Sequence, residues 1–450
     1  MGLCEHHHQD PRRYGGEARI DEVKAWSFRL ATAPVMSVRS FSVSANTNTP
    51  ASMRTPPMVA ATDPMSPGSM GSASRPRVKI LSPYSISCSR MESRGATLEL
   101  QDGTSFSGEP FGAFSPIAGE VVFNTGMVGY VESLTDPSYR GQILVLTYPL
   151  VGNYGVPADG VDDLGLPANF ESDRIQVAGL VVATLSRDYS HHSAVRSLHE
   201  WLKEGGVPGL TGVDTRHITK RLRARGVMPG RLFDGTGTVD FEDPNKRDLA
   251  SEVCAGEPCT YNEGAGPRVA VIDAGVKTSI LRSIAQRGFE VVRVPFSMDP
   301  LEVEPAALVA GNGPGDPEMY PAAVEGMRAA LEADIPVMGI CLGNQLMGLA
   351  AGGTTHKLTY GHRSQNQPAL EVGTGRCYIT SQNHGYVVDV NSLPGDWDVW
   401  FTNANDGSCE GIRREDGKAW AVQFHPEARP GPRDTDHLFD AFADMVRGGD

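Results

Sequence analysis

The chain has 450 residues, of which 40% are hydrophobic and 21% are charged, as in ordinary globular proteins of two or three domains. Its formal net charge of −14 argues against nucleic acid or an anionic membrane surface as the main partner. No apolar run reaches the roughly 18 residues that a bilayer requires, so we expect no membrane span. The seven cysteines are odd in number and scattered, which favours a reducing compartment over a disulfide scaffold.

Residues 1–93 differ in composition from the rest of the chain. Between residues 23 and 90 there are eight Lys or Arg but only one acid, Asp63, among many Ser, Thr, Pro, Met and Ala. This composition is typical of a transit peptide, so we expect a cleaved leader and a mitochondrial matrix location. The first 22 residues, however, hold five acids and three consecutive histidines. The alternatives are a start at Met36, or a cytoplasmic protein with a disordered tail.

Residues 94–233 read as a mixed, β-rich N-terminal domain, because short alternating segments are separated by turn residues. Strands are expected at residues 96–100, 105–108, 120–124, 142–148 and 175–184, and helices near 193–204 and 218–225. No group of side chains in this domain resembles a catalytic constellation.

Residues 234–266 are rich in Gly, Asp, Glu and Pro and are expected to be an interdomain linker. In residues 267–447 strands and helices alternate. Strands are expected at 268–273, 290–295, 307–310 and 335–340, and helices at 278–286, 320–333 and from 344 onward. This order predicts an α/β domain with a doubly wound sheet, whose functional site lies at the carboxyl ends of the strands.

Cys341 lies in the turn Gly339-Ile340-Cys341-Leu342-Gly343, between an expected strand and an expected helix. This G-x-C-x-G turn is the thiol counterpart of the G-x-S-x-G elbow, which holds a nucleophile on a tight bend. The amides and dipole at the start of the helix favour the thiolate. We therefore interpret Cys341 as a nucleophile rather than a buried core cysteine.

A base for this nucleophile is expected at His425, which follows the strand 419–424 and precedes Pro426 and Glu427. A carboxylate two residues from an imidazole can fix its tautomer and support the imidazolium. The loop 310–317, A-G-N-G-P-G-D-P, presents backbone amides that suit an oxyanion hole shared with the amide of Leu342. It lacks the Lys-Ser/Thr ending of a phosphate-binding loop.

These three motifs, G-I-C-L-G, F-H-P-E and G-N-G-P-G-D-P, together resemble the class I (triad) glutamine amidotransferases. Further motifs are similar to the small, glutamine-hydrolysing subunit of carbamoyl-phosphate synthetase. They are residues 119–130, 134–139, 149–155, 212–216, 381–386 and 430–434. The resemblance covers about residues 96–447, and its several long motifs occur in the family's order.

The resemblance implies that Cys341 attacks the side-chain amide of glutamine, His425 transfers the proton, and Glu427 orients His425. It implies glutamine contacts at Ser138, Gly313, Gly315, Leu342, Gln345, Asn383, Gly385 and Tyr386. Ammonia would pass to a large subunit, in a heterodimer or higher assembly, which uses ATP, Mg and bicarbonate to make carbamoyl phosphate. This chain itself would need no cofactor and no metal.

Position 344 departs from the family pattern, because the usual C-L-G-H-Q reads C-L-G-N-Q here. Asn344 is not a triad residue, so we expect activity to survive with altered coupling or glutamine affinity. The alternatives are a different amidotransferase, a non-catalytic subunit that stabilises the large chain, and a stand-alone γ-glutamyl hydrolase. The pathway (arginine or pyrimidine synthesis) and a fusion to further domains stay open.

Overall fold

The computed structural model describes residues 95–448. The expected leader, with its mitochondrial address, lies outside the described residues. Within residues 95–448, none of the helices combines the length and the apolar character needed to cross a bilayer.

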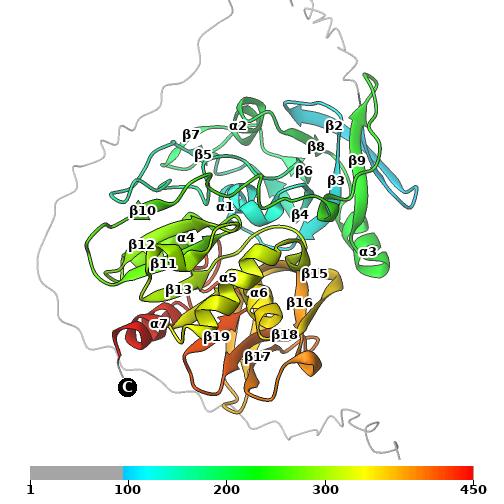
Figure 1. The fold of residues 1–450 in the computed structure, drawn as a ribbon. Helices are drawn as coiled ribbons and strands as arrows, with labels where there is room; N and C mark the ends of the chain where they lie inside the picture. The colour runs from blue at the N-terminus through cyan, green and yellow to red at the C-terminus, as the bar shows by residue number, and fades with distance from the viewer. Residues whose placement is uncertain (1–94, 449–450) are drawn as a thin grey trace, which may run out of the picture. The chain divides into compact units, whose positions relative to one another are not determined.

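The first domain is a closed barrel with the strand order β1-β2-β8-β6-β4-β3-β9 (Figure 1). The strands are β1 Ala96–Leu100, β2 Ser105–Gly112, β3 Ile117–Asn124, β4 Gln142–Val151, β6 Gly179–Leu185, β8 Pro208–Thr211 and β9 Met228–Asp234. Strands β3, β4, β6 and β8 are joined in parallel, and the remaining pairs are antiparallel. Successive residues of β4, such as Ile143 and Leu144, belong to two different core clusters, as expected from the two-residue period of a strand.

Three helices and a short strand pair accompany the barrel. They are α1 Tyr130–Thr135, α2 Leu198–Glu204, α3 Thr215–Arg225, β5 Val156–Pro157 and β7 Ala194–Arg196. The helix expected near 193–204 starts later, because 194–196 pairs with β5 and Ser197 caps α2 in a capping box with Glu200. The strand expected at 175–184 also starts later, at Gly179.

The second domain is built on a ten-stranded sheet in the order β10-β12-β11-β13-β14-β19-β18-β17-β15-β16. Its strands are β10 Cys259–Tyr261, β11 Arg268–Asp273, β12 Glu290–Pro295, β13 Ala307–Ala310, β14 Val337–Ile340, β15 Thr354–Glu371, β16 Cys377–Asp389, β17 Trp397–Asn403, β18 Cys409–Arg414 and β19 Ala419–Val422. The five strands from β12 to β19 in this order are parallel, and the outer strands are antiparallel.

Helices cover both faces of this sheet, as the α/β prediction requires. The helices are α4 Thr278–Ala285, α5 Pro321–Glu332, α6 Leu342–Ala350 and α7 His437–Arg447. Residues of α4 and α7 share one core cluster with the sheet, and residues of α5 and α6 share the other. Because β11, β13, β14 and β19 are parallel, their carboxyl ends lie together at one edge of the sheet.

The segment 234–266, expected to be a linker, is partly incorporated into this domain. Residues 259–261 form β10, which pairs antiparallel with β12 and becomes the edge strand of the sheet. The linker expectation is therefore wrong for this part. A three-residue strand is too short to produce a readable alternation in a Gly- and Glu-rich context.

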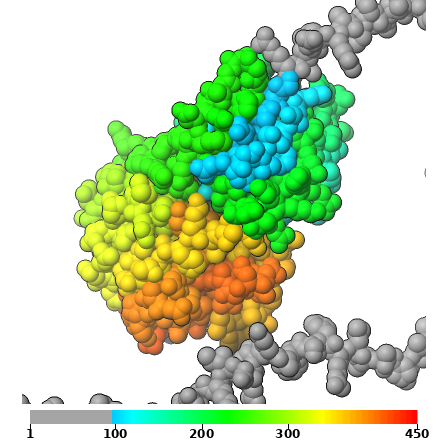
Figure 2. Space-filling model, turned by 90° about the vertical axis from the view of Figure 1, so that its right-hand side faces the viewer, coloured from blue at the N-terminus to red at the C-terminus, as the bar shows by residue number. Residues whose placement is uncertain are grey.

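Direct contacts join the barrel to the sheet domain, whose surfaces adjoin in Figure 2. The ammonium of Lys357 lies 2.6 Å from a carboxylate oxygen of Glu120 in β3. The backbone N–H of Thr125 donates to the carbonyl of Arg363 at 3.1 Å. The strands β3 and β15 thus meet where both domains contribute polar groups.

Candidate active site

The predicted elbow is present. Strand β14 ends at Ile340 and α6 begins at Leu342, so Cys341 occupies the bend, with φ 57° and ψ −102°. L-residues rarely adopt this conformation. A Cβ added at Gly339 would lie 2.6 Å from the carbonyl oxygen of Gly343, which no side chain could tolerate. The glycines therefore provide close approach of strand and helix, while the strained backbone belongs to the cysteine itself.

The side chains of Cys341, His425 and Glu427 come together in the interior, each 4% exposed or less. His425 follows β19, and its backbone N–H donates to the carbonyl of Ser381 at 2.9 Å. Its Nδ1 donates to Oε1 of Glu427 at 2.7 Å. Its Nε2 is buried and, within residues 95–448, has no hydrogen-bond partner, while the Cys341 sulfur is close enough to couple to it electrostatically.

The charges around His425 favour an imidazolium. Burial lowers the pKa of His425, but its interactions with the carboxylate of Glu427 and the sulfur of Cys341 outweigh this effect and raise the pKa to about 10. Burial raises the pKa of Glu427, but Lys277 and His425 lower it to about 2. At neutral pH the group is therefore a carboxylate holding a protonated imidazole beside the sulfur.

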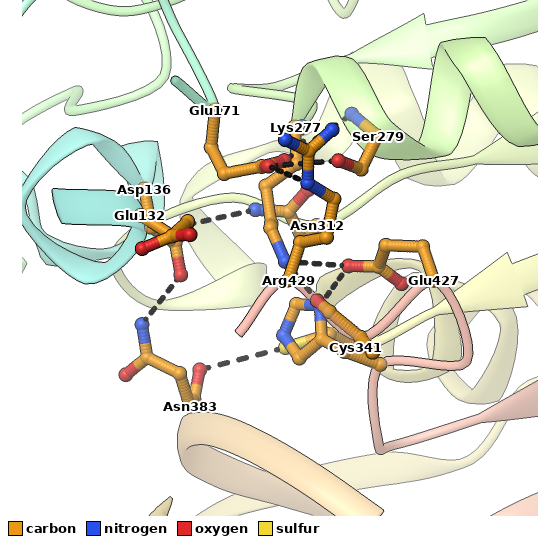
Figure 3. Close-up of polar contacts among 12 residues, drawn as sticks. Glu132, Asp136, Glu171, Lys277, Ser279, Asn312, Cys341, Asn383, Glu427 and Arg429 are labelled. Carbon is orange, nitrogen blue, oxygen red and sulfur yellow. Dashed lines mark hydrogen bonds and ion pairs between the residues drawn. The ribbon is translucent and has the colours of Figure 1, made fainter. Parts of the chain in front are cut away.

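A buried lysine that the sequence analysis missed completes this charge network (Figure 3). Nζ of Lys277 donates to Oε1 of Glu427 and to the carbonyl of Ala428, both at 2.8 Å. The two side chains are 3% and 0% exposed. Burial lowers the pKa of Lys277, yet Glu427, Glu171 and Asp136 raise it above its ordinary value, so the ammonium stays charged.

One cavity collects the predicted glutamine contacts. Its lining includes Cys341 and all eight of them, namely Ser138, Gly313, Gly315, Leu342, Gln345, Asn383, Gly385 and Tyr386. The thiol of Cys341 points toward the carbonyl of Asn383 at 3.6 Å. A Cβ at Gly313 would lie 2.6 Å from the side chain of Leu342, so the expected oxyanion loop presses on the elbow.

The barrel reaches this cavity through the short 3₁₀ helix η1 Pro137–Tyr139. Asp136 caps η1 by accepting from the backbone N–H of Ser138 at 2.9 Å. Its carboxylate also accepts from Nδ2 of Asn383 at 3.0 Å and from Nδ2 of Asn312 at 3.2 Å. Asn312 donates in addition to Oγ of Ser138 at 2.9 Å. A buried carboxylate of the barrel thus ties together three residues around the cavity, and Figure 3 shows Asp136 with two of them, Asn312 and Asn383.

Asn344 does not line the cavity. It is fully buried behind the elbow, and its Nδ2 donates to Oε1 of Gln423 at 3.1 Å. Gln423 in turn donates to the carbonyl of Cys341 at 3.3 Å. Asn344, which stands where the family usually has His, therefore belongs to the hydrogen-bonded residues behind the elbow and not to the cavity lining.

Lys277, Asp136 and Asn312 were not among the site residues predicted from the sequence. Lys277 follows β11 and precedes α4, so the rule that sites lie at strand ends could have singled it out. Asn312 lies inside the quoted glycine loop, and Asp136 lies inside the quoted motif 134–139, but only docking of the two domains brings them together.

The fold and the site define a class. A family model described as glutamine amidotransferase class-I matches residues 270–445, the part that carries the elbow, and the second domain is such a domain. A model described as carbamoyl-phosphate synthase small chain, CPSase domain, matches residues 98–232, which form the barrel.

The relatives identify the family. The chain is 47% identical over 368 residues to the carbamoyl phosphate synthase arginine-specific small chain of Aspergillus clavatus, covering 80% of this chain and 81% of the relative. This chain therefore belongs to the carbamoyl-phosphate synthase small-chain family.

The chain also resembles a part of longer proteins. It is 49% identical over 359 residues to the multifunctional protein CAD of Squalus acanthias, and 48% identical over 384 residues to the multifunctional protein pyr-3 of Neurospora crassa. Each match covers 78% of this chain but only 16% and 21% of those relatives, respectively.

Proposed function

We propose that this chain hydrolyses glutamine at Cys341 and supplies ammonia for carbamoyl phosphate synthesis. The observation that carries the proposal is the single cavity that Cys341 shares with the eight expected glutamine contacts, with His425 and Glu427 behind the thiol. Family membership supports the substrate, and the buried charge network supports the chemistry.

In the proposed first step the thiolate of Cys341 attacks the side-chain carbonyl carbon of glutamine. A carbon–sulfur bond forms, and the amides of Leu342 and Gly313 stabilise the oxyanion. His425 then gives its Nε2 proton to the departing nitrogen as the carbon–nitrogen bond breaks, which releases ammonia and leaves a γ-glutamyl thioester. Glu427 accepts a hydrogen bond from Nδ1–H of His425 in both steps, so the proton is exchanged at Nε2.

In the second step His425 takes a proton from water, whose oxygen attacks the thioester carbon. The carbon–sulfur bond breaks, the new carboxylic acid loses its remaining proton to solvent and leaves as glutamate, and the proton on His425 restores the imidazolium beside the sulfur. Every group named in these two steps, apart from glutamine and water, belongs to this chain. The partner would be a large subunit that uses the ammonia with ATP, Mg and bicarbonate.

The pathway and the location are further parts of the proposal. The relatives' names include an arginine-specific small chain and multifunctional proteins, so we propose carbamoyl phosphate for arginine or pyrimidine synthesis. A mitochondrial matrix location rests on the composition of residues 1–93 alone, with the cytoplasm as the alternative.

The test is ammonia release from glutamine by the full chain, with and without a carbamoyl-phosphate synthase large subunit. Wild type is compared with Cys341→Ala and with Cys377→Ala, a matched control that removes an exposed thiol. We expect slow hydrolysis that rises many-fold with the partner and is abolished only by Cys341→Ala. Hydrolysis absent under both conditions would support the non-catalytic, stabilising subunit, and full activity without a partner would support a stand-alone hydrolase.

A further inference from the structure

A second group of buried, chemically active side chains lies beside the cavity, which one of its members, His384, helps to line together with Asn383 and Gly385. His362 in β15 and His384 in β16 are directly opposite each other in the strand register, and their rings make a T-shaped contact with centroids 5.0 Å apart. Glu410 in β18, which is 0% exposed, completes the group. One ligand atom from each of these three residues lies within 4.8 Å of the others.

Both nitrogens of His362 face carboxylate oxygens. Nε2 lies 2.9 Å from Oδ2 of Asp406, a distance at which Nε2–H donates. Nδ1 points to Oε1 of Glu410 at 3.5 Å and, within the described part of the chain, has no hydrogen-bond partner. The side chain of His362 is only 7% exposed, so water cannot readily satisfy Nδ1.

Both nitrogens of His384 also face oxygen acceptors. Nδ1 lies 3.0 Å from the carbonyl of Tyr386, and Nε2 lies 3.1 Å from Oε1 of Gln382. The orientation of the Gln382 amide is fixed by its other end, because Nε2 of Gln382 donates to Oε2 of Glu410 at 2.8 Å. Turning the amide over would place two oxygens against each other.

These four ring nitrogens therefore face four oxygens, but two neutral imidazoles carry only two N–H protons. With the outer N–H groups donated to Asp406 and to the carbonyl of Tyr386, Nδ1 of His362 and Nε2 of His384 each keep a lone pair near the carboxylate of Glu410. A divalent cation at this point would accept both lone pairs and neutralise the carboxylates of Glu410 and Asp406.

We propose that Nδ1 of His362, Nε2 of His384 and the carboxylate of Glu410 bind a divalent transition-metal ion, of which Zn²⁺ fits the donor set best. Two imidazoles and a carboxylate are common zinc ligands. Asp406 and the carbonyl of Tyr386 accept the outer N–H groups of the two histidines, which orients the ligating nitrogens. Bonds of about 2.0–2.2 Å would draw the ligand atoms slightly closer together.

The site would stabilise the strand that carries part of the glutamine cavity. His384 lies between Asn383 and Gly385, so an ion bound to it would fix this stretch of β16 against β15 and β18. This consequence rests on the proposed function, whereas metal binding itself does not. A bound metal ion at these residues differs from the expectation from the sequence, which was that the chain needs no metal.

The first measurement is metal content and Co²⁺ absorption of the full chain after equilibration with micromolar Zn²⁺ or Co²⁺ and removal of free ion. The background variant carries His6→Ala, His7→Ala, His8→Ala and Cys341→Ala, which removes the histidine triplet and the cavity thiol as competing ligands. We expect one ion per chain, a Co²⁺ spectrum without thiolate bands, and a higher Tm with the ion than with a chelator. Less than about a tenth of an ion per chain, with an unchanged Tm, would overturn the proposal.

The second measurement compares variants in the same background. His362→Asn should lower the affinity for Zn²⁺ at least a hundredfold, whereas His356→Asn, an exposed histidine of the same strand, should leave it unchanged. If His362→Asn does not fold, Asp406→Asn is used, which should lower the affinity about 10–100-fold with all three ligands in place. Equal affinity in the histidine variants would show that the ion binds elsewhere and overturn the proposal.

The third measurement uses the chain with Cys341 intact. Removal of the ion should raise KM for glutamine several-fold while kcat changes less than about twofold. If the chain hydrolyses no glutamine at all, the proposed function fails, but the metal content and Tm still decide the metal site.

Discussion

The two domains contribute to the cavity in different ways. The sheet domain places Cys341 and His425 at the ends of neighbouring strands β14 and β19, so its topology alone brings the thiol and the imidazole together. The barrel contributes Asp136 and Ser138 from the connection between α1 and β4, and these residues reach the cavity only because the domains dock. The reactive groups are thus placed by local strand order, whereas Asp136 and Ser138 are placed at the cavity by tertiary contact between the domains.

The largest effect is expected on the sheet side, for Glu427→Gln. An amide cannot stabilise the imidazolium, so kcat/KM for glutamine should fall by roughly 10³-fold or more, by analogy with the loss of the orienting carboxylate in other triads. The check is ammonia release with the large subunit present. Loss of less than about tenfold would show that His425 does not depend on Glu427.

The same carboxylate predicts the pH profile. His425 has a raised pKa of about 10, so the imidazolium that protonates the leaving nitrogen should persist through neutral pH, and wild-type kcat/KM should fall as pH rises through about 10. The contribution of the His425 imidazolium to the free energy of unfolding is fully present below about pH 6.5. It is lost as the pH rises from about 6.5 to about 10. Glu427→Gln should move the falling limb to lower pH, and an unmoved limb would contradict the assignment.

A somewhat smaller effect is expected for Lys277→Met, which also acts on the sheet side. The variant leaves the buried carboxylate of Glu427 without its cation, which raises the pKa of Glu427 and lowers the free energy of unfolding by about 3–5 kcal/mol. We expect kcat to fall about 10–100-fold in the folded fraction. Denaturant titration and steady-state kinetics are the measurements. The control is Lys418→Met, which removes a partly exposed ion pair and should cost less than about 1 kcal/mol.

On the barrel side, Asp136→Asn should raise KM rather than lower kcat. The amide keeps the volume but can accept fewer hydrogen bonds from Ser138, Asn312 and Asn383, and each lost bond is worth about 1 kcal/mol. We expect KM for glutamine to rise about tenfold. Asp102→Asn, in the turn after β1, is the matched control and should leave KM unchanged. A fall in kcat with constant KM would remove the distinction between the two domains.

The smallest effect is expected for Asn344→His, which restores the family's usual residue. Asn344 is buried behind the elbow and touches Gln423 rather than the cavity. We therefore expect kcat and KM to change less than about threefold. If the large subunit stimulates glutamine hydrolysis much more strongly in Asn344→His than in wild type, the residues packed behind the elbow control how the site responds to the large subunit.

The sequence predicted the elements of the sheet domain more accurately than its contacts. Strands β11, β12 and β13 were predicted with their exact bounds because parallel strands buried on both faces form mainly apolar runs. The bounds of β10 and β7 could not be predicted, because strands of three residues carry no periodic signal.

Some residues of the candidate site could likewise be predicted from the sequence, and others could not. Cys341, His425 and Glu427 follow from motifs at strand ends, and the resemblance supplied the eight cavity residues. The roles of Lys277 and Asp136 depend on burial, which turns a lysine or an aspartate from a solvated group into the partner of another buried group. Burial of a single charged residue is not encoded in its neighbours along the chain.

The most direct test of the proposed chemistry at Cys341 is to trap the acyl-enzyme. The full chain is mixed with glutamine and the large subunit, quenched in acid within one turnover, digested, and analysed by mass spectrometry. The account predicts a γ-glutamyl thioester on the peptide that contains Cys341, absent without glutamine and absent in Cys341→Ala. Ammonia release at the wild-type rate without any adduct on Cys341, or persisting in Cys341→Ala, would contradict it.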